Sequence, residues 1–362
     1  MFEQLSLQVP AFGLDISDLS IKIIQLKKQG NRKALASFGE FKVPRGVIVQ
    51  GEIKKPDELT AILKEAREGV RGERLTATRV VASLPEERAF LQVVQLPLLR
   101  EDEIQEVIRF QAEKYIPYPL ESVYLDYQLA EPLVDHLNHK DVLIAALPRQ
   151  IADSYLDVLL KAGLTPVAFE VESLAVCRAL VEKEISPAPL LLLDIGATRT
   201  GLAVFAGKSP IFTSSIPVSS HHLTEAAAKA LGVDVRTAEA LKIRYGIITS
   251  RGEGENVAAS LKPLLSDLVG HVKRYLEYYS SHATHQHLEP EGAKLSKVLL
   301  CGGGSLLKGL PEFLGQELGL EVELGNPWTN VFSRPVSNLP PLSLQESLRY
   351  TTALGLAIRA IT

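Results

Sequence analysis

Cysteine is scarce in this sequence. Only Cys177 and Cys301 occur among 362 residues, each lies in an apolar run, and neither belongs to a C-x-x-C pair. Two isolated thiols in apolar surroundings indicate a reduced compartment and buried, unreactive cysteines. No run approaches the ~20 apolar residues of a membrane span, and the first residues lack the basic and apolar regions of a secretory signal. We therefore expect a cytoplasmic chain that does not itself insert into a membrane.

An excess of basic charge is also missing. The chain has 39 Lys and Arg against 43 Asp and Glu, for a net charge of −4, and the basic residues are scattered. A protein that binds nucleic acid normally shows a basic balance or a basic stripe, so we expect no nucleic-acid partner. The Walker motif G-x-x-x-x-G-K-S/T is absent as well, which argues against a P-loop motor. A length of 362 residues predicts at least two domains.

Two segments about half a chain apart share one pattern. The segments at 11–30 and 190–209 each begin with an apolar strand that ends in Asp, followed by a short polar turn and a second strand. In the first segment, Ile21 and Ile23 flank Lys22, and alternation of period two predicts a strand. Two matching hairpins predict an ancient duplication that produced two similar domains.

A block of a different kind, at 85–164, separates the two segments. It contains an amphipathic helix whose apolar face carries Ile104, Ile108 and Ala112. Pro117 follows this helix and ends it. The order strand, helix, strand, strand, helix predicts a small α+β insert.

Both hairpin tips carry groups that suit phosphate. Free backbone N–H groups in a turn form an anion-binding nest, and Ser and Thr hydroxyls add donors. Each Asp would repel phosphate in direct contact and instead suits Mg²⁺ held through water. Two facing tips would hold a triphosphate between two domains; alternatively, each is an ordinary polar turn. The candidates are Asp15, Ser17, Ser20 and Lys22 in the first hairpin, and Asp194, Gly196, Thr198 and Thr200 in the second.

A glycine loop is the third candidate element. The strand at 297–301 runs into Gly302, Gly303, Gly304 and Ser305 before a helix begins. Glycine permits a close backbone approach to a flat ligand, although the same run also suits a tight strand-to-helix turn. The order of two hairpins followed by this loop favours a nucleotide site.

Together these elements resemble the actin-like ATPase superfamily over nearly the whole chain. Residues 13–22 and 193–202 are similar to its two phosphate loops, and residues 298–310 to its adenosine loop. Residues 171–180 and 350–360 are similar to its two connecting helices. The resemblance implies an α/β fold of actin-like type, with two duplicated domains around a cleft that binds ATP or ADP with Mg²⁺.

The resemblance adds three residues to the candidate site. Residues 238–246 are similar to the segment whose Glu and Lys approach the ribose and adenine, which implies Glu239 and Lys242. These two also suit a surface ion pair, because helix residues three apart are neighbours. The family's first connecting helix carries a Glu that positions the attacking water, and the matching catalytic candidate is Glu172. A Glu at a helix N-terminus is equally favoured by the helix dipole.

Within the superfamily, the sequence is most similar to the PilM family of type IV pilus assembly proteins. Residues 106–128 resemble that family's signature, and the insert at 85–164 occupies the place of the extra subdomain that PilM shares with the cell-division protein FtsA. FtsA usually continues into a linker and an amphipathic helix, whereas this sequence stops at Thr362. The resemblance therefore favours PilM over two alternatives, an FtsA-like filament protein and a small-molecule kinase. The implied division is domain 1 at 1–84, 165–189 and 342–362, the inserted subdomain at 85–164, domain 2 at 190–220 and 296–341, and subdomain 2B at 221–295.

The resemblance also implies a role and a partner. It implies an ATP-binding adaptor, at most a slow ATPase, held peripherally at the inner membrane by the N-terminal cytoplasmic tail of a PilN-like membrane protein. It leaves open the oligomeric state, and whether the machine is a pilus or a type II secretion system. The tail would bind in a groove between the first domain and the insert. Apolar residues on a proline-flanked segment suit such an interface, although they also suit internal packing. They are Tyr115, Ile116, Tyr118 and Leu120.

One loop departs from the family pattern. The first phosphate loop of the family normally reads Asp-Ile-Gly-Ser-Ser-Ser, but residues 15–20 read DISDLS. Asp18 adds a negative charge near the expected phosphate, and two charges ~5 Å apart at an effective dielectric of ~20 repel by roughly 3 kcal/mol. Unless Asp18 turns away or meets a cation, we expect weak nucleotide binding, or binding without turnover.

Overall fold

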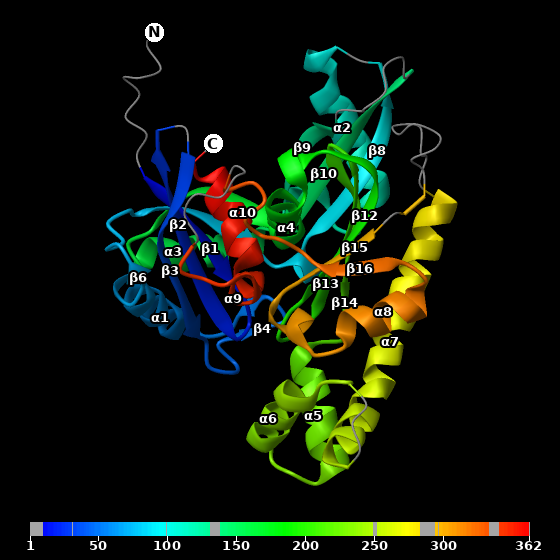
Figure 1. Cartoon of the computed structure of the whole chain (residues 1–362). Helices are drawn as coiled ribbons and strands as arrows, with labels where there is room; N and C mark the ends of the chain where they lie inside the picture. Colours follow the sequence, from blue (N-terminus) through cyan, green and yellow to red (C-terminus); the bar gives the residue numbers. More distant parts are fainter. Residues whose placement is uncertain are drawn as a thin grey trace.

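The computed structural model describes residues 10–30, 32–98, 100–130, 138–248, 252–282, 294–295, 297–332 and 340–361. Two large sheets form the bodies of two domains, and a smaller sheet forms a separate projection beside them (Figure 1).

The first domain is built on a six-stranded sheet in the order β11-β7-β1-β2-β3-β6. Strands β1, β2 and β3 are antiparallel neighbours, whereas β7 is parallel to both β1 and β11. Every residue of β1 is buried, as expected for a strand covered on both faces. The strands are β1 (Ala11–Ile16), β2 (Ser20–Gln29), β3 (Arg32–Lys42), β6 (Arg71–Gly72), β7 (Arg79–Leu84) and β11 (Thr165–Val171), with the hairpin β4 (Ile48–Val49) and β5 (Glu52–Ile53) and the helices α1 (Pro56–Glu68) and α3 (Arg149–Lys161).

The second domain repeats this arrangement with five strands in the order β14-β13-β12-β15-β16. Strands β12, β13 and β14 are antiparallel neighbours, and β15 is parallel to both β12 and β16. Its strands are β12 (Ser186–Ile195), β13 (Thr200–Gly207), β14 (Ser209–Ile216), β15 (Lys297–Cys301) and β16 (Glu321–Leu324), and helix α8 (Leu310–Leu318) joins the last two. The shared order and directions confirm the two duplicated domains of an actin-like fold.

The extra subdomain interrupts one crossover of the first domain. In the second domain, the chain passes from β15 through α8 to β16; in the first, it passes from β7 through the extra strands and then α3 to β11. The inserted elements are β8 (Phe90–Pro97), α2 (Glu101–Tyr115), β9 (Val123–Ala130) and β10 (His139–Pro148), with sheet order β8-β10-β9. They enclose a core of their own, which includes Ile104, Ile108 and Val142.

Helix α3 lies within the 85–164 range expected for the insert, but it packs elsewhere. Its side chains Ile151, Tyr155 and Leu159 are buried in the core of the first domain. The reason is topological, because α3 is the crossover helix between two parallel strands and such a helix packs back onto the sheet. By packing, the insert therefore ends with β10.

Helices α4 (Glu172–Leu180) and α10 (Thr351–Arg359) connect the two domains and contact each other closely. A Cβ atom at Gly355 would lie 1.8 Å from the Ala175 carbonyl oxygen, so only glycine permits this approach. Short helix α9 (Leu344–Ser347) precedes α10. Cys177 on α4 and Cys301 on β15 are both free and buried, as expected.

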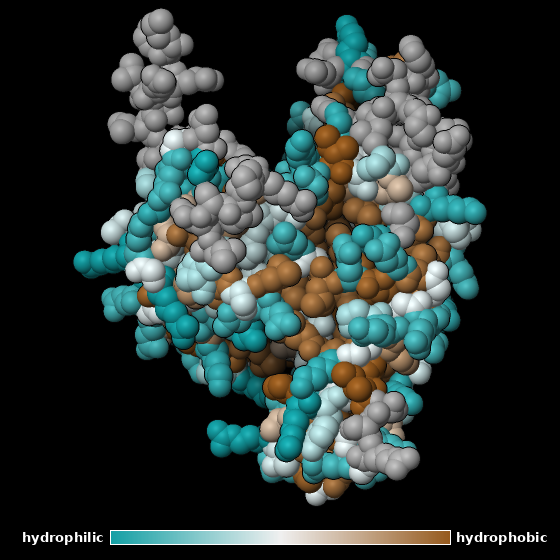
Figure 2. Space-filling view, viewed as in Figure 1, coloured by the Kyte–Doolittle hydropathy of each residue, from teal (hydrophilic) through white to brown (hydrophobic). Residues whose placement is uncertain are grey.

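The remaining subdomain consists of α5 (Ser220–Leu231), α6 (Val235–Tyr245) and the long α7 (Glu253–His282). It extends below the second domain in Figure 1. In the same view, apolar residues gather at the centre of the face, around β15 and β16, and continue toward the insert, while hydrophilic residues cover the outer sides (Figure 2). Of the helices described, none is long and apolar enough to cross a membrane.

Candidate functional site

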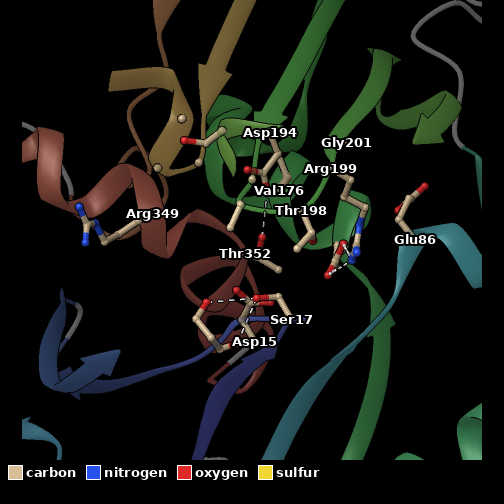
Figure 3. Close-up of a pocket in the computed structure, with 18 of the residues that line it drawn as sticks. Asp15, Ser17, Glu86, Val176, Asp194, Thr198, Arg199, Gly201, Arg349 and Thr352 are labelled. Atoms are coloured by element: carbon tan, nitrogen blue, oxygen red, sulfur yellow. Dashed lines mark hydrogen bonds and ion pairs between the residues drawn. The ribbon is translucent and has the colours of Figure 1, made fainter. Parts of the chain in front are cut away.

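A cavity of about 260 Å³ lies between the two domains, where the two hairpin tips face each other (Figure 3). In the first tip, the Ser17 N–H donates to the Ser20 carbonyl at 2.9 Å. In the second, the Gly196 N–H donates to the Arg199 carbonyl at 2.9 Å. The two tips thus have closed, well-defined turns. Twelve of the residues predicted from the sequence line this cavity: Asp15, Ser17, Ser20, Lys22, Glu172, Asp194, Gly196, Thr198, Glu239, Gly302, Gly303 and Gly304.

Three predicted residues lie behind the cavity wall. Thr200 is buried and its hydroxyl donates to the Val218 carbonyl at 2.7 Å. Ser305 is buried and donates to the Gly302 carbonyl at 2.7 Å. Lys242 is also buried and donates to Glu239 at 2.8 Å. These side chains hold the cavity wall in place, and only Glu239 of the last pair reaches the cavity.

The first hairpin places an ion pair at the cavity. The Lys22 Nζ donates to Asp15 Oδ2 at 3.0 Å, because the two residues are paired across β1 and β2. The Ser83 hydroxyl donates to Asp15 Oδ1 at 3.3 Å. Burial opposes the Lys22 charge, but Asp15 outweighs burial and the pKa of Lys22 is raised.

The second hairpin contributes Asp194 directly opposite. Burial first, and then the Asp15 charge, raise the pKa of Asp194 to about 6. The Thr352 hydroxyl donates to Asp194 Oδ2 at 3.4 Å. The glycine loop packs against the same side chain: a Cβ atom at Gly302, where φ is +78°, would lie 2.2 Å from Asp194 Oδ1. Glycine is required here both by space and by backbone conformation.

Acidic side chains outnumber basic ones around the cavity. The carboxylates belong to Asp15, Glu40, Glu86, Glu172, Asp194 and Glu239, and the cations to Lys22, Arg199 and Arg349. A polyphosphate without a cation would therefore be repelled, whereas Mg²⁺ would offset the excess negative charge. Among the described residues, no cluster of three or more His, Cys, Asp or Glu is arranged to hold a metal directly.

Glu172, the catalytic candidate, is held by an arginine that the sequence analysis did not single out. Both carboxylate oxygens of Glu172 accept from Arg199 Nη2 at 2.9 Å. Arg199 Nη1 also donates to Glu87 Oε1 at 2.6 Å. Burial raises the pKa of Glu172 to about 8, although the Arg199 charge opposes that shift. Glu172 is therefore engaged in an ion pair across the two domains.

Asp18 turns away from the cavity. Its carboxylate accepts the backbone N–H groups of Gln50 and Gly51, each at 3.0 Å. These residues form the two-residue turn between β4 and β5, with φ values of 50° and 73°. Weak nucleotide binding was expected unless Asp18 turned away. Its carboxylate does turn away, toward backbone donors and not toward the expected phosphate.

Several cavity residues escaped the sequence analysis. Arg199 lies between the predicted Thr198 and Thr200, and Thr352 lies within the segment similar to the second connecting helix. Glu86 follows β7 in a 3-10 turn (Glu86–Arg88), is buried, and accepts from the Ser173 N–H at 3.2 Å. The sequence could have pointed to Arg199 and Thr352, because each lies within or beside a motif that had been recognised.

The four residues predicted to contact a partner separate into two groups. Tyr115 and Tyr118 are 48% and 45% exposed, whereas Ile116 is 6% exposed and packs in the core of the insert. Leu120 is partly buried against the same core. Ile116 and Leu120 thus pack against the core of the insert, and the contact of all four residues with a partner stays a prediction.

The comparisons with known proteins agree with the fold and identify the family. The family model described as type IV pilus assembly protein PilM matches residues 13–361. A solved PilM-PilN type IV pilus biogenesis complex is 30% identical, with a TM-score of 0.81 over 98% of this chain and 99% of that one. MreB5 of Spiroplasma citri, 13% identical with a TM-score of 0.56 over 96% of this chain and 95% of that one, shares the fold.

A curated relative is more distant. Cell division protein FtsA of Agrobacterium fabrum is 28% identical over 196 residues, which cover 50% of this chain and 42% of FtsA. The chain thus matches less than half the length of this relative. Since the PilM family model covers nearly every residue from the first phosphate loop to the last helix, the chain belongs to the PilM family of type IV pilus assembly proteins.

Proposed function

We propose that this chain is a cytoplasmic, nucleotide-binding adaptor of the type IV pilus assembly machinery. It binds ATP or ADP with Mg²⁺ in the interdomain cavity and binds the N-terminal cytoplasmic tail of a PilN-like inner-membrane protein, which holds it at the membrane. The observation that carries the nucleotide part is the meeting of two hairpin tips and one glycine loop around a single cavity.

The residues present fit a Mg-nucleotide. The turns at Ser17 and Gly196 border the cavity, and Lys22 supplies a positive charge there. Asp15 and Asp194 are suited to water ligands of Mg²⁺, which when bound would offset charge on the phosphates. Gly302 and Gly304 pack closely against the end of β12, and the space beside Gly303 is open to a flat base or sugar. MreB5, which shares this fold, is described as bound to ADP.

Hydrolysis is expected to be slow. A water-positioning carboxylate must be free to contact the water. Both oxygens of Glu172 accept from Arg199, so this ion pair must open before Glu172 can do so. The first tip also lacks the glycine and hydroxyls of the family pattern at 17–19. Both features support a binding site that turns over its nucleotide slowly.

A groove on the insert supports the docking part. A hollow of about 270 Å³ lies between α2, β9 and the start of α3, and its lining includes Arg109, Leu120, Tyr127 and Arg149. Strand β9 is the outer strand of its sheet, so one edge has no strand partner among the described residues. An extended tail can add to such an edge and place alternate side chains in the hollow. Since α3 belongs to the first domain's core, this groove lies at the junction of domain and insert.

The solved PilM-PilN complex, similar over nearly the whole chain, supports PilN as the partner. Two guanidinium groups, those of Arg109 and Arg149, border the hollow and can donate to carbonyl or carboxylate oxygens of the tail. Tyr127 is 37% exposed and offers the aromatic surface typical of an interface anchor.

Calorimetry with the full chain tests the nucleotide part. We expect Mg-dependent binding of ATP and ADP, weakened by Asp15→Ala, Asp194→Ala and Gly303→Val. Absence of binding by the wild-type chain, or binding that Asp194→Ala leaves unchanged, would contradict it.

Fluorescence anisotropy with a labelled peptide of the PilN-like tail tests the docking part. We expect a micromolar or tighter Kd, about −8 kcal/mol, and at least a tenfold loss with Tyr127→Asp, about the loss of one good anchor. The matched control is Ile243→Asp, since Ile243 is 62% exposed on α6, away from the insert. Equal affinity of the two variants would rule out the groove.

A further inference from the structure

Arg199 makes the closest charged contacts between the two domains at the nucleotide cavity. It projects from the tip between β12 and β13 of the second domain. Its two terminal nitrogens bind different carboxylates, Glu87 at 2.6 Å and Glu172 at 2.9 Å. Glu87 leads into the insert, and Glu172 begins the first connecting helix. One cation thus joins the second domain to two segments of the first. Figure 3 shows Arg199 on the wall of the cavity.

The charges around this contact do not balance. A single guanidinium faces two carboxylates, and the buried Glu86 lies on the same cavity wall. Burial also raises the pKa of Glu87. Arg199 is therefore held by two carboxylates, and an anion that displaces them must carry more than a single charge. A terminal phosphate has that charge and offers three acceptor oxygens in a geometry suited to guanidinium.

We propose that Arg199 is the residue by which this cleft distinguishes ATP from ADP, because the terminal phosphate of ATP competes with Glu172 and Glu87 for its guanidinium. The inference rests on the nucleotide binding proposed above. Arg199 lies beside Thr198 on the second phosphate tip and lines the cavity with it. It is also held by Glu172, which lines the same cavity. ADP lacks this phosphate and leaves both ion pairs in place.

The same exchange reaches a second hollow. Arg199, Thr198 and Glu86 also line a space of about 950 Å³ between the first domain, the start of the insert and β14, and Glu87 lies on its wall. When Arg199 binds phosphate, Glu87 loses its cation and faces this hollow. Glu87 therefore sets how readily Arg199 is released, and its neutralisation favours ATP.

The test is the ratio of ATP to ADP affinity, measured by calorimetry with Mg²⁺ on the full chain. We expect Arg199→Ala to weaken ATP at least about tenfold, the loss of one charge-assisted hydrogen bond, while ADP affinity changes by less than about threefold. The ATP affinity of Arg199→Lys should fall between those of the wild type and Arg199→Ala, since lysine keeps the charge but lacks the paired N–H donors of the guanidinium. Glu87→Gln should raise the ratio, because the amide competes less for the guanidinium.

Arg45→Ala is the matched control. Arg45 also pairs across the domains, with Glu225 at 3.8 Å, but it does not line the nucleotide cavity. The inference is supported if the ATP-to-ADP affinity ratio falls in Arg199→Ala and rises in Glu87→Gln. The ratio should stay unchanged in Arg45→Ala. If the wild type binds nucleotide but the ATP-to-ADP affinity ratio is unchanged in Arg199→Ala or Glu87→Gln, the inference fails while the proposed function stands. Absence of any nucleotide binding by the wild type overturns both this inference and the proposed function.

Discussion

Replacing Asp18 by alanine should destabilise the first domain and leave nucleotide affinity nearly unchanged. The Asp18 carboxylate accepts two backbone N–H groups, those of Gln50 and Gly51, at 3.0 Å each. Alanine would leave both donors without this acceptor, and a buried donor that loses its partner costs about 1–3 kcal/mol. The Gln50 φ of 50° is itself unfavourable for a non-glycine residue, so the turn depends on such support. We expect a total loss of about 2–5 kcal/mol.

Urea denaturation and amide hydrogen exchange across 48–53 would measure this loss. Asp18→Asn is the control, because its amide oxygen keeps one acceptor while the charge is removed, and about half of the loss should return. If electrostatic repulsion dominated instead, both variants would bind Mg-ATP more tightly by about a hundredfold, as roughly 3 kcal/mol of repulsion requires. Tighter ATP binding with unchanged stability would refute the reasoning from the turn.

Three further predictions follow from the cavity. Gly302→Ala should weaken nucleotide binding and lower the melting temperature, since its Cβ would meet Asp194 Oδ1 at 2.2 Å; an unchanged melting curve would contradict the close packing. The raised pKa of Asp194, about 6 against an ordinary 3.8, means that the folded chain holds this proton more tightly than the unfolded chain. Stability of the nucleotide-free protein should therefore fall by about 3 kcal/mol as pH rises from about 4 to 7, and denaturation of Asp194→Asn should show a flatter profile. Phosphate release from Mg-ATP should stay far below the rate of a motor, because the first tip lacks the glycine and hydroxyls of the family pattern at 17–19; brisk release that Glu172→Gln abolishes would contradict this expectation.

The sequence predicts those parts of the site that depend on neighbours in the chain. Hairpin residues such as Asp15 and Lys22 meet across one turn, so alternation and a polar tip are sufficient to locate them. The pairing of Arg199 with Glu172 is different, because it joins residues 27 positions apart through the packing of two domains. The direction of Asp18 is set by a turn 32 residues away. Neither contact has a local pattern from which it follows.

The internal packing of Ile116 had a readable signal in the sequence. Ile104, Ile108, Ala112 and Ile116 are spaced by four, which places them on one helix face. The structure buries all four in the core of the insert. The proline after Ile116 suggests a break in the pattern, but the packing face continues to the end of the helix. Tyr115, the last residue of α2, and Tyr118, beyond its end, are exposed.

The uneven crossovers of the two domains record an order of events in the ancestry of the chain. Both halves keep a strand, a crossover helix and a parallel strand, as β7-α3-β11 and β15-α8-β16. Only the first copy carries β8, α2, β9 and β10 between its strand and its helix. An ancestral half that already contained these elements would have passed them to both copies. The simplest history is therefore duplication first and acquisition of the subdomain later, at a loop where the older core, α3 included, was left intact.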